Sequence, residues 1–274
     1  IIGYGQSTIL SSCSTKKNGY ILGDKYVGGI AGGFRGAIRA DGEVQVTTNA
    51  SYVIGNSYVG GIVGKNTENV TIENCVNNGV AAGYDRYIGG ITGYNDATIA
   101  DCASYLSDYN NSIFKMIVSA WKATGDYVGG ITGYNNGRIT FSKASQKITV
   151  KSVSSIVAGE NYVGGIAGFN DVAGTLDVNY TLIGGKVYAY GDCAGGGFGF
   201  NASTEVLTKE LTIKPTSVQG RYYVGGCIGA NVVNLSQNLT MEYFRADNRL
   251  GSIVGEAFCG GIIGYQRTYT AKQF

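Results

Sequence analysis

The chain has 274 residues, of which 45 are Gly, 21 are Tyr, one is Pro and none is His, and only 15% are charged. A net charge of +2 gives no reason to expect nucleic acid or an anionic membrane as a partner. The lack of His excludes Ser-His and Cys-His nucleophile pairs and the H-E-x-x-H zinc motif from this segment, and we expect no enzyme activity and no cofactor.

A seven-residue motif with paired glycines recurs along the chain. It reads YVGGIAG in the first copy and YVGGITG in the fourth, and its eight copies begin 29 to 40 residues apart. The copies begin at Tyr26, Tyr58, Tyr87, Tyr127, Tyr162, Cys193, Tyr223 and Phe258. Such a period is typical of repeat architectures, in which each repeat is one small unit that stacks on its neighbours.

Each period contains short stretches suited to strands and corners. In chain order, β-branched stretches follow the motif at 70–72, 97–99 and 138–140, and a Gly-acid or Gly-Asn corner precedes the next motif, as at Gly55-Asn56 and Gly125-Asp126. Two or three short strands with turn residues at the corners describe one coil of a β-solenoid. We therefore predict an all-β fold, a parallel β-helix-like solenoid of about eight to nine coils of roughly 29–40 residues.

The array predicts one solenoid segment over residues 1–274. Because Ile1–Gly5 matches the back half of a motif, we expect the segment to be cut from a longer chain at both ends. The sequence holds no apolar run of the length that a membrane span needs, so we expect no direct span in this segment. The longest period, which starts at Tyr87, predicts an insertion at 103–124.

Stacking predicts columns of like residues, because identical side chains at equivalent positions hold neighbouring coils in register. The aromatic column is Tyr26, Tyr58, Tyr87, Tyr127, Tyr162 and Tyr223, with Phe258 at the last copy. The aliphatic core column is Ile30, Ile62, Ile91, Ile131 and Ile166. The amide column is Asn66, Asn95, Asn135 and Asn170, continued by Asn201, Asn231 and Gln266.

The columns have two interpretations. A buried Asn column would close a corner by bonding between coils, and the alternative is a row of ligand-binding amides. A second aromatic set beside it, Tyr94, Tyr134, Phe169, Phe200 and Tyr265, would stack, and the alternative is a sugar-binding surface. For the paired glycines we expect a bend with a bulky side chain lying over bare backbone, with the column tyrosine as a candidate.

The insertion carries the only Trp, Trp121, and one of two Met residues, Met116. Loops that leave one face of a solenoid often bind partners, so Met116 and Trp121 are candidate interaction residues. The alternative is a bulged strand or short helix that caps an edge of the core.

Other polar groups have a functional and a structural interpretation. Asp96 and Asp101 resemble a carboxylate pair, but nothing clusters around them and solvated turns explain them. Acids before the motif could form a calcium-binding edge or serve as turn residues. Cys75 and Cys102, with Cys13 near the same place, occupy equivalent positions in successive coils and could pair or remain free and buried.

The repeat resembles a known family. GGIVGKN (Gly60 to Asn66), an Ile-x-x-Cys strand at Ile72 and Cys75, then NNGV at 77–80 and YIGGITG together look like the GLUG-motif repeat of large secreted and surface-attached bacterial proteins. The resemblance covers essentially the whole chain. It implies an exported setting, because the family occurs in adhesin-like surface proteins and in non-catalytic regions of IgA-cleaving zinc metalloproteases, where it is thought to form solenoid-like stalks.

Two classes of function follow. The first is a structural and adhesive segment of a bacterial cell-surface or extracellular fibre protein, with a surface protein or glycan as partner and with self-association into fibres as an extension. The second is an accessory solenoid that positions substrate for a secreted protease or glycan-active enzyme. Both place the chain outside the cell or on its surface.

Overall fold

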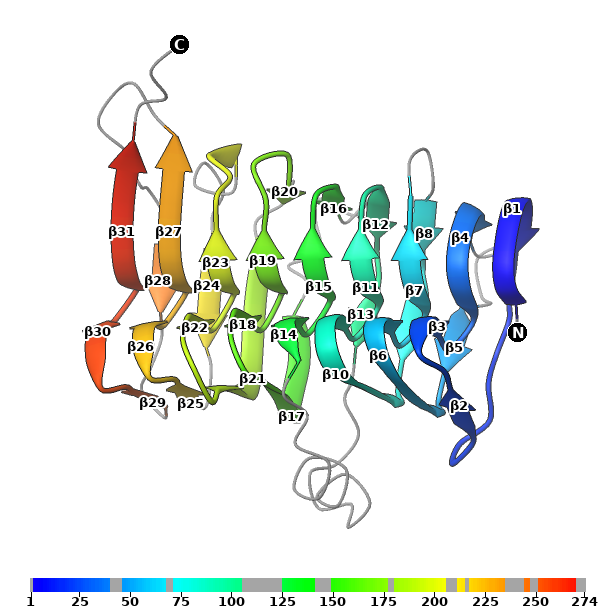
Figure 1. Cartoon of the computed structure of the whole chain (residues 1–274), viewed down its shortest axis with the longest axis horizontal. Helices are drawn as coiled ribbons and strands as arrows, with labels where there is room; N and C mark the ends of the chain where they lie inside the picture. The colour runs from blue at the N-terminus through cyan, green and yellow to red at the C-terminus, as the bar shows by residue number, and fades with distance from the viewer. Residues whose placement is uncertain are drawn as a thin grey trace.

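The computed structural model describes residues 2–39, 46–67, 71–104, 125–140, 149–176, 180–205, 211–214, 217–234, 244–246 and 251–269. These residues form a β-solenoid, as the repeat predicted, with equivalent strands of successive repeats side by side along one axis (Figure 1). The solenoid has about six turns, slightly fewer than the eight to nine coils predicted.

The second half of each motif forms a strand of the longest sheet. Its strands lie in the order of the repeats, and every pair is parallel. They are β1 (Ile2–Leu10), β4 (Ala31–Ile38), β7 (Val63–Asn66), β11 (Thr92–Asn95), β15 (Thr132–Asn135), β19 (Ala167–Asn170), β23 (Phe198–Asn201), β27 (Ile228–Asn234) and β31 (Ile263–Tyr269). The long strand β4 also pairs with the short strand β8 (Thr71–Glu73), and from β8 the sheet continues through β12 (Thr98–Ala100), β16 (Arg138–Thr140) and β20 (Thr175–Leu176), each paired with the one before.

The first half of each motif lies in a second parallel sheet. This sheet contains β2 (Tyr20–Leu22), β3 (Lys25–Gly28), β6 (Tyr52–Gly60), β10 (Val80–Gly89), β14 (Asp126–Gly129), β18 (Val163–Gly164), β22 (Ala194–Gly195), β26 (Tyr222–Gly225) and β30 (Ala257–Gly260). Each motif therefore crosses from one sheet to the other at its paired glycines.

Two smaller sheets complete the coils. One is formed by β5 (Thr47–Asn49), β9 (Cys75–Asn77) and β13 (Ala103–Ser104). The other belongs to the later repeats and is formed by β17 (Thr149–Gly159), β21 (Tyr180–Ala189), β24 (Leu211–Lys214), β25 (Ser217–Gln219), β28 (Phe244–Ala246) and β29 (Ser252–Val254).

The aliphatic column lies in the interior at the bend between the two main sheets. Its five isoleucines, at exposures of 0 to 2%, are Ile30, Ile62, Ile91, Ile131 and Ile166. Backbone hydrogen bonds continue through this bend, with the Ile30 N–H donating to the Ile62 carbonyl at 2.9 Å and the Ile62 N–H to the Ile91 carbonyl at 3.0 Å. The core is thus a stack of equivalent side chains, because the ladder carries the same motif position into every coil.

Candidate binding surface

The first motif residue is held in an uncommon backbone conformation. All eight of these residues have φ between 54° and 64°, in the left-handed region that bulky residues rarely adopt. They are Tyr26, Tyr58, Tyr87, Tyr127, Tyr162, Cys193, Tyr223 and Phe258. None of the motif glycines has positive φ, because the only described glycine that does is Gly185. The bulky residue, rather than the glycine, therefore makes the left-handed kink that leads into each bend.

These kinked residues place a column of rings on the outside of the solenoid. Ring centroids of consecutive members lie 4.7 Å apart for Tyr26 and Tyr58, 5.3 Å for Tyr87 and Tyr127, and 5.0 Å for Tyr127 and Tyr162. Cys193 interrupts the column, which resumes with Tyr223 and Phe258 at 5.2 Å. All these rings are half-buried or exposed.

A second column of rings lies beside the first. Tyr94 stacks on Tyr134 at 4.9 Å, Tyr134 on Phe169 at 5.2 Å, and Phe169 on Phe200 at 4.7 Å, with planes within 5° of parallel. Edge contacts join the two columns, as between Tyr87 and Tyr134 at 5.5 Å and 84°.

The amide column lies directly behind the second ring column, on the inward side of the same strands. Asn Nδ2 of each coil donates to the side-chain oxygen of the next at 2.7 to 2.8 Å, from Asn66 through Asn231 to Gln266. The six Asn side chains are fully buried. The structure therefore places these amides where they join coils, and a ligand cannot reach them.

A second polar column escaped the sequence reasoning. Asn49 Nδ2 donates to Asn77 Oδ1 at 2.8 Å, and Asn77 Nδ2 donates to Ser104 Oγ at 3.3 Å. In the sequence, the only sign of this column is that Asn49 and Asn77 each end a short strand-like stretch. The third coil carries Ser104 at the equivalent position.

The paired glycines have two different packing partners. A Cβ on the first, as at Gly28, would overlap the carbonyl oxygen of Ala31 in its own motif. A Cβ on the second, Gly29, would lie 2.6 Å from the side chain of Asn49, and Asn77 and Ser104 lie against the equivalent glycines of the next two coils. A side chain does cover bare backbone, but it belongs to the second polar column and not to the tyrosines.

The acids near the corners form bonds within the coil stack. Asn161 Nδ2 donates to Asp126 Oδ1 at 3.0 Å, and Arg221 Nε donates to Asp192 Oδ1 at 3.2 Å. Asp96 accepts from Asn136 Nδ2 at 2.7 Å. Among the described residues there is no group of three or more His, Cys, Asp or Glu side chains placed to hold a metal ion. Their observed contacts are those of turn residues.

None of the six cysteines forms a disulfide in the structure. Strand register puts Cys75 next to Cys102, and the neighbouring thiol together with burial raises the pKa of Cys75 well above its ordinary value. Burial raises the pKa of Cys193 and of Cys227 to about 12. Since the thiolate is the reactive form, these buried thiols are poor nucleophiles. Cys259 is exposed.

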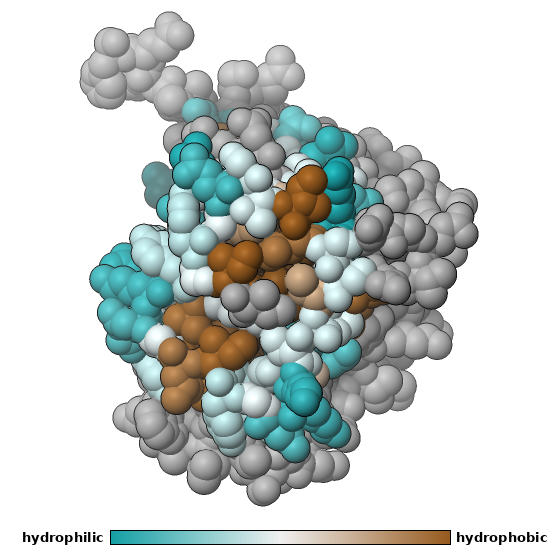
Figure 2. All heavy atoms as spheres, turned by 90° about the vertical axis from the view of Figure 1, so that its right-hand side faces the viewer, coloured by the Kyte–Doolittle hydropathy of each residue, from teal (hydrophilic) through white to brown (hydrophobic). Residues whose placement is uncertain are grey.

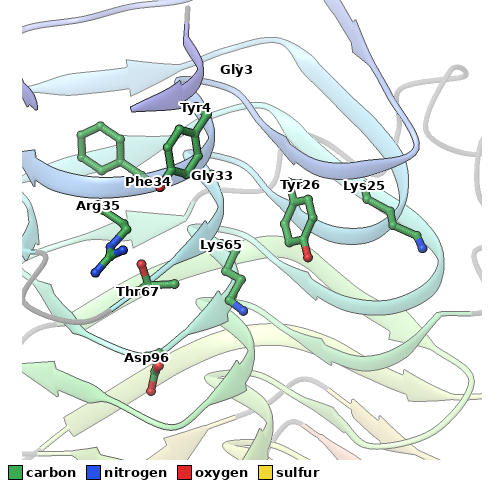
Figure 3. A pocket seen from close by; sticks show the side chains of 10 residues that line it. All are labelled: Gly3, Tyr4, Lys25, Tyr26, Gly33, Phe34, Arg35, Lys65, Thr67 and Asp96. Carbon is green, nitrogen blue, oxygen red and sulfur yellow. The ribbon is translucent and has the colours of Figure 1, made fainter. Parts of the chain in front are cut away.

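The second ring column is broken at the first coils. Register runs from Tyr4 to Gly33, from Gly33 to Lys65 and from Lys65 to Tyr94, so Gly33 stands where later coils carry a ring. A cleft with a volume of about 680 Å³ opens at this break. Its lining, seen in Figure 3, is Gly3, Tyr4, Lys25, Tyr26, Gly33, Phe34, Arg35, Lys65, Thr67 and Asp96.

The cleft combines ring surfaces with positive charge. The lining includes three cations, Lys25, Arg35 and Lys65, and one carboxylate, Asp96. Lys65 Nζ lies 4.9 Å from the centre of the Tyr94 ring and 5.6 Å from that of Tyr58, which is cation–π geometry. Such a lining can bind an anionic or hydroxyl-rich ligand.

The end of the solenoid beside the cleft exposes apolar side chains. Figure 2 looks onto this end, where hydrophobic residues lie between hydrophilic ones. Ile9 is 58% exposed and Leu22 is 70% exposed. This is the face on which a further coil would stack.

No family model, no curated protein and no solved structure matches this chain. The likeness to GLUG-motif repeats therefore stays a prediction. Met116, Trp121 and nearly all of the insertion at 103–124 lie outside the described residues. No helix in the described part of the chain is long and apolar enough to cross a membrane.

Proposed function

We propose that this chain is a non-catalytic structural and adhesive segment of a large bacterial cell-surface or extracellular fibre protein. The observation that carries the proposal is the unbroken amide column from Asn66 to Gln266, in which seven side chains join successive coils by hydrogen bonds. From Asn95 to Asn231 each buried side-chain amide both accepts and donates within the column, and such pairing makes one arrangement of the coils specific. Such a stack suits a spacer that holds its length.

The use of the polar groups also supports a structural role. The corner acids Asp126 and Asp192 bond to Asn161 and Arg221 in neighbouring coils, where they fasten turns. The GLUG-like repeat adds the expectation of an exported, surface-attached protein. Self-association belongs to the same proposal, because the apolar side chains at the end shown in Figure 2 would pack against a further coil, either of this protein or of a second copy.

The cleft favours a second candidate function. A site with rings, three cations and one carboxylate suits an accessory solenoid that holds substrate for a protease or glycan-active enzyme. In that case the catalytic groups would lie in another part of the protein that contains this segment.

Surface accessibility and deletion separate the candidates. In the native host, the segment is expected to be cleaved from intact cells by added protease, and its deletion is expected to reduce cell adhesion without reducing any hydrolytic activity of the protein. Loss of a hydrolytic activity on deletion would favour the accessory role. A segment protected inside intact cells would overturn both.

A further inference from the structure

The cleft exists because one rung of the second ring column is missing. Strands in a sheet lie about 4.8 Å apart, so Tyr4 and Lys65, two strands apart, leave a gap of about 10 Å at Gly33. Rings further along this column stack at 4.7 to 5.2 Å. The gap therefore has the thickness of one additional ring.

The Tyr4 ring leans into this gap without closing the cleft. A Cβ on Gly33 would lie 3.0 Å from Cδ2 of Tyr4, so the Tyr4 ring leans over the glycine and its surface lines the cleft. Tyr26 lines it from the first ring column (Figure 3). Tyr4 is 61% exposed and Tyr26 is 46% exposed, so both rings have surface to offer a ligand.

The polar groups of the cleft are available for bonding. Within the part of the chain that the structure describes, the charged groups of Lys25 and Arg35 form no hydrogen bond or ion pair, and Thr67 Oγ1 is buried without a hydrogen-bond partner. Asp96 uses one oxygen for Asn136 and keeps the other. The cleft thus offers three cationic donors, one hydroxyl and one carboxylate oxygen around ring surfaces.

We propose that this cleft binds a carboxylate-bearing pyranose residue of an acidic glycan, whose ring packs against the exposed surfaces of Tyr4 and Tyr26. A pyranose has an apolar C–H face that packs on aromatic rings and a rim of hydroxyl groups that need both donors and acceptors. The sugar carboxylate pairs with Arg35, because a guanidinium binds a carboxylate through two parallel hydrogen bonds. Asp96 and Thr67 accept the sugar hydroxyls.

A planar aromatic acid fits the lining less well. Such an acid would stack on the rings and pair with the cations. It would bring no hydroxyl group to donate to Asp96, and its own carboxylate would lie near that of Asp96 without a proton between them. The inference deepens the adhesive part of the proposed function by naming its ligand class. The adhesive role and the glycan binding can be refuted independently. A segment found inside cells would overturn the adhesive role without changing what the cleft binds in solution.

Binding is tested by nuclear magnetic resonance titration of the whole chain with tetragalacturonate and, in parallel, with 3′-sialyllactose. The expected result is a saturable shift of Tyr4, Gly33 and Tyr26 resonances with at least one acidic probe, and which probe binds tells a uronate from a sialic acid ligand. The fully methyl-esterified tetragalacturonate, which lacks only the charge, is expected to bind about tenfold more weakly than the uronate if the uronate binds.

Variants assign the site. Arg35→Gln is expected to weaken acidic-probe binding about tenfold. Gly33→Tyr, whose side chain would displace the Tyr4 ring and fill the cleft, is expected to abolish it. Arg267→Gln, an exposed arginine at the other end of the solenoid, is the matched control and should leave affinity unchanged. Thermal unfolding of each variant shows that it is folded. The inference is overturned if neither acidic probe shifts these residues, if the methyl ester binds as tightly, or if Arg35→Gln binds like the control.

Discussion

Tyr134 and Asn135 are neighbours in β15, yet they belong to columns that tolerate change very differently. Asn135 points inward, and its column stays amide in every coil from Asn66 to Gln266. Tyr134 points outward, and in its column other coils carry Gly33, Lys65 or Ala230. The inner column is restricted because a buried polar group without a partner is costly, whereas an outer ring can be replaced at a smaller cost.

The inner column can be broken by removing one amide. In Asn135→Leu, Asn95 Nδ2 loses its acceptor and Asn170 Oδ1 loses its donor, and each buried orphan costs about 1 to 3 kcal/mol. We expect the free energy of unfolding to fall by about 2 to 6 kcal/mol in urea titration. Gln266→Ala, at the exposed end of the column, is the control and should lose less than about 1 kcal/mol. Equal losses in the two variants would contradict a column that depends on burial.

The glycine bend offers a comparison at one motif position. In Gly130→Ala the new Cβ would overlap the backbone carbonyl of Gly165 in the next coil, whereas at Gly261 nothing lies within 4 Å. Neither glycine has positive φ, so only crowding differs. We expect Gly130→Ala to lower the free energy of unfolding by about 3 kcal/mol and Gly261→Ala to change it by less than about 0.5 kcal/mol. A thermal melt of both variants checks this, and similar melting temperatures would refute the account of the bend.

The outer column should show pairwise coupling of modest size. Tyr134 stacks on Phe169 with planes 2° apart. A double-mutant cycle of Tyr134→Leu and Phe169→Leu, measured by urea unfolding, should give a coupling of about 0.5 to 1.5 kcal/mol. A cycle of Tyr134→Leu with Phe258→Leu, whose ring lies several coils away, is the control and should give no coupling beyond error. Coupling in that distant pair would show that the rings do not act as local contacts.

Buried thiols should give a smaller, pH-dependent effect. Burial raises the pKa of Cys193 and of Cys227 to about 12, so the folded state keeps their protons. Their stabilisation is complete below the thiol pKa of the unfolded chain, near 9.0, and is lost as pH rises toward 12. At pH 9.5 each of these two thiols should lower the free energy of unfolding by about 1 kcal/mol relative to pH 7.

The two alanine variants isolate this effect from other titrating groups. The loss of unfolding free energy between pH 7 and pH 9.5 should be about 1 kcal/mol smaller in Cys193→Ala, and likewise in Cys227→Ala, than in the original chain. Cys259→Ala, which removes an exposed thiol, is the control. Identical profiles for all four proteins would rule out thiol burial as the cause.

The fold was predictable because residues repeat at positions that stack. The spacing of YVGGIAG copies predicts a parallel solenoid, since equivalent strands must lie together. The left-handed kink at Tyr26 and its equivalents was not predictable, because a bulky residue gives no sign of adopting φ near 56°. The second polar column was missed because it runs through only three coils and ends in Ser104. The sequence carries one sign of the cleft, which is Gly33 at a position where later coils carry a ring. This sign could be recognised only once the strand register had aligned Tyr4, Gly33 and Lys65.

Hydrogen exchange of the side-chain amides tests the inner column most directly. In the intact chain, the NH₂ protons of Asn95, Asn135 and Asn170 should exchange with solvent only through unfolding, because each amide is buried and bonded to the next coil. The exposed Asn78 provides the fast reference within the same molecule. The account predicts exchange that is slower by orders of magnitude in the column than at Asn78. Equal rates would contradict a buried amide ladder as the feature that holds the coils in register.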